Sequence, residues 1–138
     1  MNNIDNKKLI RKLHDIWNTN NISALPEVYS NNVVVHWSKS SENPNSLGHV
    51  GISQAIADTL LAFPDWHENI VDIIAEDDKI VTRYVSTGTH TGAYQSIAPT
   101  GNKIKVDEIS IFRIKNGKVT EQWCLMDDLA LAKQLETP

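Results

Sequence analysis

The sequence predicts an α+β fold in which a curved antiparallel sheet wraps around N-terminal helices. In the first half of the chain, apolar residues recur at three- and four-residue spacing, as on the buried face of a helix. From residue 68 onward the pattern changes to the two-residue period of strands. The length of 138 residues suits one domain, so we expect residues 1–138 to fold as a single unit.

Three helices are expected before the main sheet. The first rests on four apolar residues at helical spacing: Leu9, Leu13, Ile16 and Trp17. Asp5 suits its N-cap, and the Asn-rich segment 18–21 ends it. A short second helix is expected over 22–29. A third fits residues 52–63 and stops at Pro64, because proline disfavours helix in the residue before it.

The first strands follow from β-branched runs. Residues 33–37 form such a run, and the Ser-, Asn- and Pro-rich segment 38–48 after it predicts a loop. Strands over 69–76 and 79–90 flank the polar turn Asp77–Asp78 and predict a hairpin.

A second hairpin and a short helix complete the chain. The Gly- and Pro-bearing segment 91–103 predicts a loop. Strands over 105–115 and 118–127 flank Asn116–Gly117, a strong hairpin signal, and residues 128–135 predict the closing helix. A sheet curved around the helices would leave a cavity between the two layers.

Composition excludes several classes of function. The 13 basic and 17 acidic residues give a formal net charge of −4, which offers no general attraction for nucleic acid or an anionic membrane. Cys124 is the only cysteine, so neither an intrachain disulfide nor a thiolate zinc site is expected. No two of the five histidines are four residues apart, and common nucleotide and zinc motifs are absent, so we expect no metal and no cofactor.

The N-terminal segment lacks the apolar run of a secretory signal. No apolar run approaches the roughly 20 residues that a membrane span needs. We therefore expect a cytoplasmic protein that does not enter a membrane.

The last predicted strand holds the main candidate for catalysis. By strand period Glu121, Trp123, Leu125 and Asp127 share one face. A carboxyl beside Trp and Leu would be partly desolvated, which raises its pKa and suits it to general acid or base catalysis near neutral pH. The alternative is that Asp127 only caps the closing helix, for which Asp128 is equally suited.

Which residues of the preceding strand share this face depends on the turn. A two-residue loop at Asn116–Gly117 places one set beside Asp127: Glu108, Ser110 and Phe112. A three-residue loop with a glycine bulge places the other set there: Asp107, Ile109 and Ile111. We prefer the second set, because it gives the more apolar wall.

Other candidates surround this strand. His36 alternates with Val35 and Trp37, and would either complete hydrogen bonds at a strand end or orient a substrate oxygen. The expected pocket is lined by aromatic and aliphatic side chains: Trp17, Trp37, Phe63, Tyr94, Ile109, Ile111, Trp123 and Leu125. Cys124 has no obvious base nearby in the sequence and is not expected to be a nucleophile.

The segment 63–135 closely resembles the SnoaL-like polyketide cyclase family. The shared motifs are FPD at 63–65, AEDDK at 75–79, GTHTG at 88–92, APTG at 98–101, IFR at 111–113, NGK at 116–118 and the E-x-W-x-x-x-D that ends at Asp127. They cover about half of the chain and come in the right order. The N-terminal half agrees more loosely, through Trp17–Asn18, His36 and Gly51.

The resemblance implies the cone-shaped α+β barrel that these cyclases share with nuclear-transport-factor-like proteins. It implies intramolecular aldol ring closure on a polyketide ester, without metal or cofactor. An aspartate matching Asp127 is the family's acid/base residue, and His36 is a looser match. The chain departs from the family at Cys124, where a polar residue is frequent, and at Trp37, where a smaller or acidic residue is usual.

Three functions are consistent with this sequence. The first is a cofactor-independent cyclase in which Asp127 is the acid/base and His36 its polar helper. The second is a non-catalytic protein that binds a small hydrophobic organic ligand on the same fold. The third is a related hydrolase or isomerase that pairs Asp127 with Glu108 or Asp107. Apolar residues on the outer face of the sheet need cover, so we expect a homodimer or a higher homo-oligomer.

Overall fold

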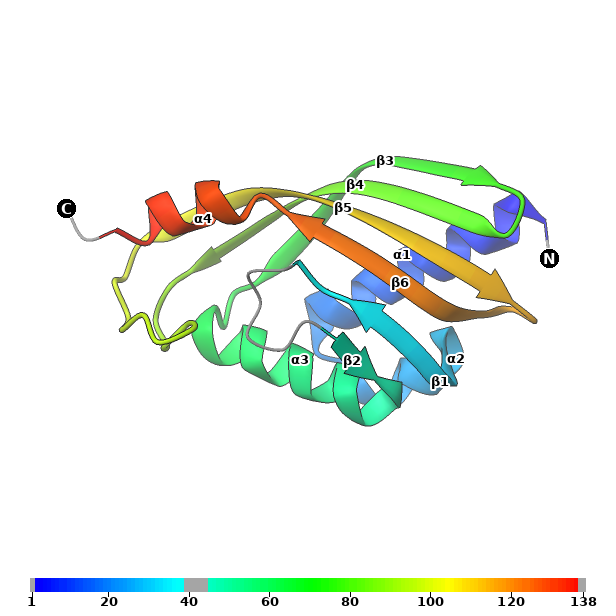
Figure 1. The fold of residues 1–138 in the computed structure, drawn as a ribbon, viewed down its shortest axis with the longest axis horizontal. Coiled ribbons are helices and arrows are strands. Elements are labelled where there is room, and N and C mark those ends of the chain that lie inside the picture. The colour runs from blue at the N-terminus through cyan, green and yellow to red at the C-terminus, as the bar shows by residue number, and fades with distance from the viewer. Residues whose placement is uncertain (1, 39–44, 137–138) are drawn as a thin grey trace.

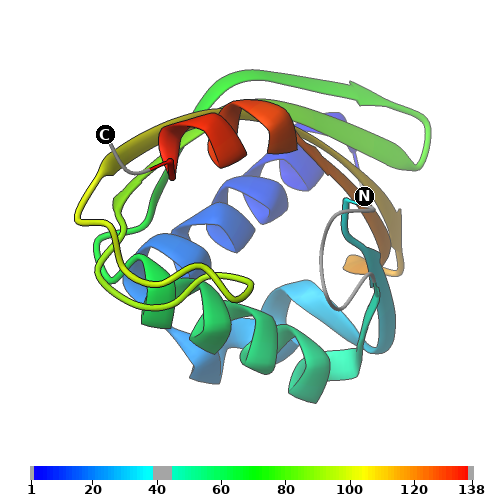
Figure 2. The same ribbon diagram turned by 60° about the vertical axis from the view of Figure 1, so that its left-hand side comes forward.

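A computed structural model describes residues 2–38 and 45–136 of the chain. Six strands form one curved, unclosed sheet in the order β2-β1-β6-β5-β4-β3, and α1 and α3 lie on its inner side (Figure 1). The turned view in Figure 2 shows the sheet bending over α1, with α4 at one end. The predicted α+β architecture is therefore confirmed.

The helices form close to the predicted positions. They are α1 (Asn3–Thr19), the 3-10 turn η1 (Ile22–Ala24), α2 (Leu25–Val28), α3 (Gly48–Ala62) and α4 (Asp128–Gln134). The predicted N-cap of α1 was wrong. The side chain of Asn2 caps this helix by accepting a 2.9 Å hydrogen bond from the backbone N–H of Asp5, which lies in the first turn. Asn20 ends the helix in the left-handed conformation at φ 55°.

Five of the six strands correspond to predicted ones. They are β1 (Tyr29–His36), β3 (His67–Glu76), β4 (Lys79–Thr89), β5 (Lys103–Lys115) and β6 (Lys118–Met126). The short strand β2 (Asn45–Leu47) was not predicted, because its segment reads as part of the loop over 38–48. Residues 39–44 of that loop lie outside the described residues.

The prediction of a purely antiparallel sheet was wrong in one place. β1 pairs parallel to β6, with His36 opposite Trp123, while the other pairs of neighbouring strands are antiparallel. A parallel pair needs a long connection, and here β2, α3, the β3–β4 hairpin and β5 lie between its strands in the sequence.

A bulge sets the register between β5 and β6. Asn116 and Gly117 form a two-residue turn with φ of 51° and 74°, the positive values that a hairpin turn of this length requires. The pairing then shifts between Arg113 and Ile114, because Thr120 is an extra residue in β6. Beyond the shift, Ile109 lies opposite Leu125 and Ile111 opposite Trp123, so the preferred register was right. The bulge that creates it lies within β6 and not in the loop.

The two faces of the sheet differ from the pattern that the apolar residues suggested. The inner face is buried against the helices, yet it carries a polar group at its centre: Thr82, Ser86, Glu108, Ser110 and Gln122. The outer face carries exposed aliphatic side chains: Ile74, Ile109, Ile111 and Leu125. The main core lies between α1, α2, α3 and the sheet, and a smaller one surrounds Phe63 beside α4.

Among the described residues, no helix is long and apolar enough to cross a membrane.

Candidate functional site

A pocket of about 680 Å³ opens between α3, β2 and the inner face of the sheet. One side is formed by α3 and the segment Ala93–Gln95, and another by Trp17 and Trp37. Its polar floor comes from β5 and β6, where Glu108 and Cys124 lie next to each other. The start of α4 contributes Asp128.

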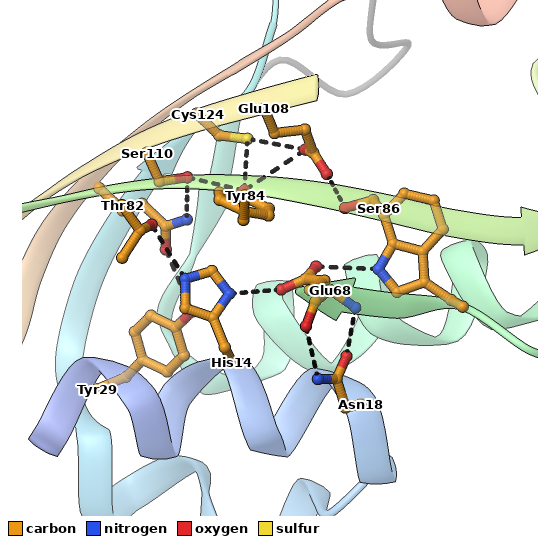
Figure 3. Close-up of polar contacts among 12 residues, drawn as sticks. His14, Asn18, Tyr29, Glu68, Thr82, Tyr84, Ser86, Glu108, Ser110 and Cys124 are labelled. Atoms are coloured by element: carbon orange, nitrogen blue, oxygen red, sulfur yellow. Dashed lines mark hydrogen bonds and ion pairs between the residues drawn. The ribbon is translucent and has the colours of Figure 1, made fainter. Parts of the chain in front are cut away.

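Glu108 is the buried acidic group of this pocket. Its side chain lies on β5, the residue is 4% exposed, and it faces the helices and not the solvent. Three neutral groups donate to its carboxyl: the hydroxyl of Ser86, the thiol of Cys124 at 3.4 Å and the hydroxyl of Tyr84 at 3.5 Å (Figure 3). No described basic side chain forms an ion pair with it.

Burial raises the pKa of Glu108 to about 8. The negative charge of Glu68 adds to the rise, and the hydrogen bonds from Ser86, Cys124 and Tyr84 oppose it. Near neutral pH this carboxyl therefore exists in both protonation states. A group of this kind can accept a proton as a carboxylate and donate one as an acid.

A hydrogen-bonded chain fixes the position of these groups. Tyr84 contacts Ser110 at 2.9 Å and the thiol of Cys124 at 3.4 Å. Gln122 donates to Ser110 at 3.3 Å and accepts from Tyr29 at 3.2 Å. Burial raises the pKa of Tyr84 and of the Cys124 thiol well above their usual values, so both remain protonated donors at neutral pH.

A second buried carboxyl, Glu68, lies deeper than the pocket. It contacts His14 at 2.7 Å and accepts a hydrogen bond from the indole N–H of Trp66 at 2.9 Å (Figure 3). The other ring nitrogen of His14 contacts Thr82 at 3.1 Å. Glu68 does not line the pocket. It acts on the site through its negative charge, which raises the pKa of Glu108.

Asp127 lies elsewhere. Its carboxyl accepts a 3.1 Å hydrogen bond from the backbone N–H of Ala130 and so caps α4, its side chain is exposed, and it does not line the pocket. The expectation of a partly desolvated carboxyl was therefore wrong. The cause is strand geometry, because β6 directs Gln122 and Cys124 inward, and Asp127 follows on the opposite side.

His36 also lies outside the pocket lining. Its ring contacts Glu121 at 2.7 Å and Asn45 at 3.2 Å, and stacks on Trp123 with ring centres 5.6 Å apart. Arg113 donates to the same Glu121 at 2.9 Å and lies over the Trp123 ring. These contacts join β1, β5 and β6 on the outer face, in agreement with the structural alternative for this histidine.

Three of the predicted pocket residues line it. Trp17 and Trp37 pack edge to face with ring centres 5.8 Å apart, and Tyr94 lies on the opposite segment. Phe63 is buried against Trp66 and Tyr94, without reaching the pocket. The remaining four residues lie on the outer face of the sheet: Ile109, Ile111, Trp123 and Leu125.

A signal for Glu108 was present in the sequence. On β5, every second residue faces inward, and this face carries Ile104, Val106, Phe112 and Ile114. Glu108 and Ser110 interrupt that apolar face, while the opposite face is mostly charged. A polar pair in the middle of a buried face is the usual sign of a functional site. The apolar residues Ile109 and Ile111 favoured the opposite face of β5 as the pocket wall, although both side chains point outward.

Within residues 2–38 and 45–136, no group of three or more His, Cys, Asp or Glu side chains could hold a metal ion.

Comparison with known proteins agrees with the fold and the motifs. The family model for SnoaL-like polyketide cyclases matches residues 7–135. The chain belongs to this family. None of the curated proteins matches it.

Several solved structures are similar over nearly the whole chain. IdmH from Streptomyces antibioticus, provisionally described as a polyketide cyclase, has 25% identity and a TM-score of 0.80, with 94% of this chain and 96% of IdmH covered. AclR from Streptomyces galilaeus, provisionally described as a hydroxylase, has 26% identity and a TM-score of 0.79, with 94% and 83% covered. TsrD from Streptomyces laurentii shows the same fold at 23% identity and a TM-score of 0.87, with 100% and 99% covered.

Proposed function

We propose that this member of the family catalyses proton transfer on a small carbonyl compound in the pocket, with Glu108 as the acid/base group and without a cofactor. The observation that carries the proposal is a buried carboxyl on the pocket floor, held by three neutral donors and with its pKa raised to about 8. Intramolecular aldol cyclisation is the reaction that this arrangement and the family support best.

The proposed chemistry needs one carboxyl. The Glu108 carboxylate removes a proton from a carbon between two carbonyl groups, and the resulting enolate attacks a second carbonyl of the same molecule. The protonated Glu108 then returns the proton to the new alkoxide. The walls of the pocket fold the substrate and bring the two reacting carbons together, which supplies proximity and orientation. Cys124 and Tyr84 hold the carboxyl in place for both steps.

Asp127 remains the competing candidate, because the family motif assigns the acid/base role to it. Its exposed position at the N-cap of α4 favours a role in holding that helix. A pair of variants, Glu108→Gln and Asp127→Asn, separates the two candidates, since each replaces one carboxyl by a neutral amide of the same shape.

The experiment measures the exchange of the acidic C–H protons of ethyl benzoylacetate in deuterated buffer by NMR. This compound is neutral, aromatic and enolisable, and exchange reports proton removal even when no ring closes. We expect the protein to accelerate exchange, Glu108→Gln to lose the acceleration, and Asp127→Asn to retain it. Retention in Glu108→Gln with loss in Asp127→Asn would refute the assignment. Binding without any acceleration would instead favour a non-catalytic binding protein.

We also propose that a second copy of the chain covers the outer face of the sheet. The strand pairing aligns Ile74, Val81, Ile111 and Trp123 in one row across four strands, and Ile109 and Leu125 lie in the next row. Ile74 and Leu125 are 61% and 68% exposed, and such adjacent apolar side chains are typical of an interface.

Light scattering coupled to size exclusion tests the dimer. We expect the wild-type protein to be at least a dimer, and Leu125→Glu to shift it toward the monomer while Val50→Glu, at another exposed apolar site, does not. A monomeric wild-type protein would refute the proposal.

A further inference from the structure

The ionisable side chains in the described lining of the pocket are all carboxyl, thiol or phenol groups. Its described lining includes three acidic side chains, Asp58, Glu108 and Asp128, and no Lys, Arg or His. Glu108 lies at the floor, Asp58 on α3 and Asp128 at the start of α4, so acidic groups approach the space from three separate elements.

None of these three groups is neutralised by a described basic side chain. The ion pairs among the described residues involve other acidic groups. Among the described residues Asp58 accepts a 2.8 Å hydrogen bond from Gln54, and the described partners of Glu108 are hydroxyl and thiol groups. An anionic ligand in this space would lie near Asp58 and Asp128, and near Glu108 in its ionised form, with no matching cation among the described lining residues, which is electrostatically unfavourable.

The walls of the pocket suit a flat, positively charged ligand. The rings of Trp17, Trp37 and Tyr94 all line it. Aromatic faces carry negative charge density and attract ammonium groups within about 6 Å, and tryptophan does so best. The two tryptophans pack edge to face, which fixes both rings before a ligand enters.

We infer that the pocket selects aromatic or aliphatic ligands that carry an amine, accepts neutral ones less tightly, and rejects carboxylates and other anions. This inference deepens the proposed function, because it names the substrate class for the same pocket. It predicts that the natural substrate reaches the enzyme as a neutral ester or an amine and not as a free acid.

Three compounds with one skeleton test the charge preference: tryptamine, tryptophol and indoleacetate. At neutral pH the first is a cation, the second is neutral and the third is an anion, while the indole ring stays the same. Isothermal titration calorimetry at low salt gives their dissociation constants. We expect tryptamine to bind at least about tenfold more tightly than indoleacetate, with tryptophol between them, since one nearby charge in a partly screened site changes affinity by this order.

Variants assign the preference to the pocket. We expect Asp58→Asn and Asp128→Asn each to reduce the tryptamine-to-indoleacetate ratio, and the double variant to reduce it further. Glu76→Gln is the matched control, because it removes one acidic group at an exposed site that does not line the pocket. We expect it to leave the ratio unchanged.

Three results would overturn the inference: indoleacetate binding as tightly as tryptamine, no binding of tryptamine at millimolar concentration, or an unchanged ratio in the double variant. Because binding is measured without turnover, the result is independent of the proton-exchange assay. The Glu108→Gln variant distinguishes the two tests. We expect it to lose the acceleration of proton exchange but to keep the preference for tryptamine over indoleacetate, because Asp58 and Asp128 remain.

Discussion

Replacing Glu108 by glutamine should stabilise the protein at alkaline pH while it removes the proposed acid/base group. The carboxyl has its pKa raised from 4.5 to about 8 in the folded chain, chiefly because it is buried. At about 1.4 kcal/mol per pKa unit, a shift of this size corresponds to roughly 3–5 kcal/mol.

The sign of the effect follows from proton binding. Between pH 4.5 and about 8 the folded protein keeps the proton of Glu108, whereas the unfolded chain has lost it. The contribution of this group to stability is therefore fully present below pH 4.5, and it is lost as the pH rises through about 8. Glutamine stays neutral at every pH, so the Glu108→Gln variant does not lose this contribution.

Denaturant unfolding of the wild type and of Glu108→Gln at about pH 5, 7 and 9 measures the difference in unfolding free energy. We expect the unfolding free energy of the variant to rise by a few kcal/mol relative to that of the wild type as the pH goes from about 5 to about 9. Comparing the two proteins at each pH removes the titration of groups that they share. Glu76→Gln controls for the loss of one acidic group at an exposed site. A difference between wild type and Glu108→Gln that does not vary with pH would refute the argument that Glu108 is desolvated.

Three further predictions follow from the same geometry. The kcat/KM for proton removal should rise about tenfold per pH unit below about pH 8 and level off above it, because only the Glu108 carboxylate accepts a proton. A flat pH profile of kcat/KM from about pH 6 to 9 would exclude Glu108 as the base. Gly92→Ala should lower the free energy of unfolding by roughly 1–3 kcal/mol in thermal unfolding, because the Cβ of the alanine would lie 1.9 Å from the backbone oxygen of Leu61. An unchanged Tm would show that the loop moves freely. Glu68→Gln should destabilise the fold by roughly 1–3 kcal/mol in denaturant unfolding, because an amide cannot satisfy the buried contacts of Glu68 with both His14 and Trp66. A loss under about 0.5 kcal/mol would show that these buried contacts do not hold the fold together.

The order of elements could be predicted from the sequence because it depends on local signals. The hairpin at Asn116–Gly117 forms at the predicted turn, since these two residues adopt positive φ more easily than most. Strand β2 could not be predicted, because three residues carry little pattern of their own and pair only after β1 is in place. The parallel pairing of β1 with β6 is equally non-local.

The candidate site was harder to predict because binary patterning assigns apolar residues to the inside. On β6 this rule selects Trp123 and Leu125, yet these side chains point outward and Cys124 points inward. The rule fails here for two physical reasons. A pocket needs polar groups on the inner face, and an apolar outer face is acceptable where another surface covers it.

The buried position of Glu108 connects the stability of this protein with its proposed chemistry. A carboxyl in this place destabilises the fold at alkaline pH, and an amide or an aliphatic residue of similar volume would avoid that cost. The surrounding residues do not remove the cost, since Ser86, Cys124 and Tyr84 are neutral donors and the negative charge of Glu68 raises the pKa further. A cationic partner would stabilise the carboxylate and lower its pKa, which would weaken it as a base near pH 8. The lack of a cation among the described neighbours is therefore what keeps this group both basic and able to return a proton.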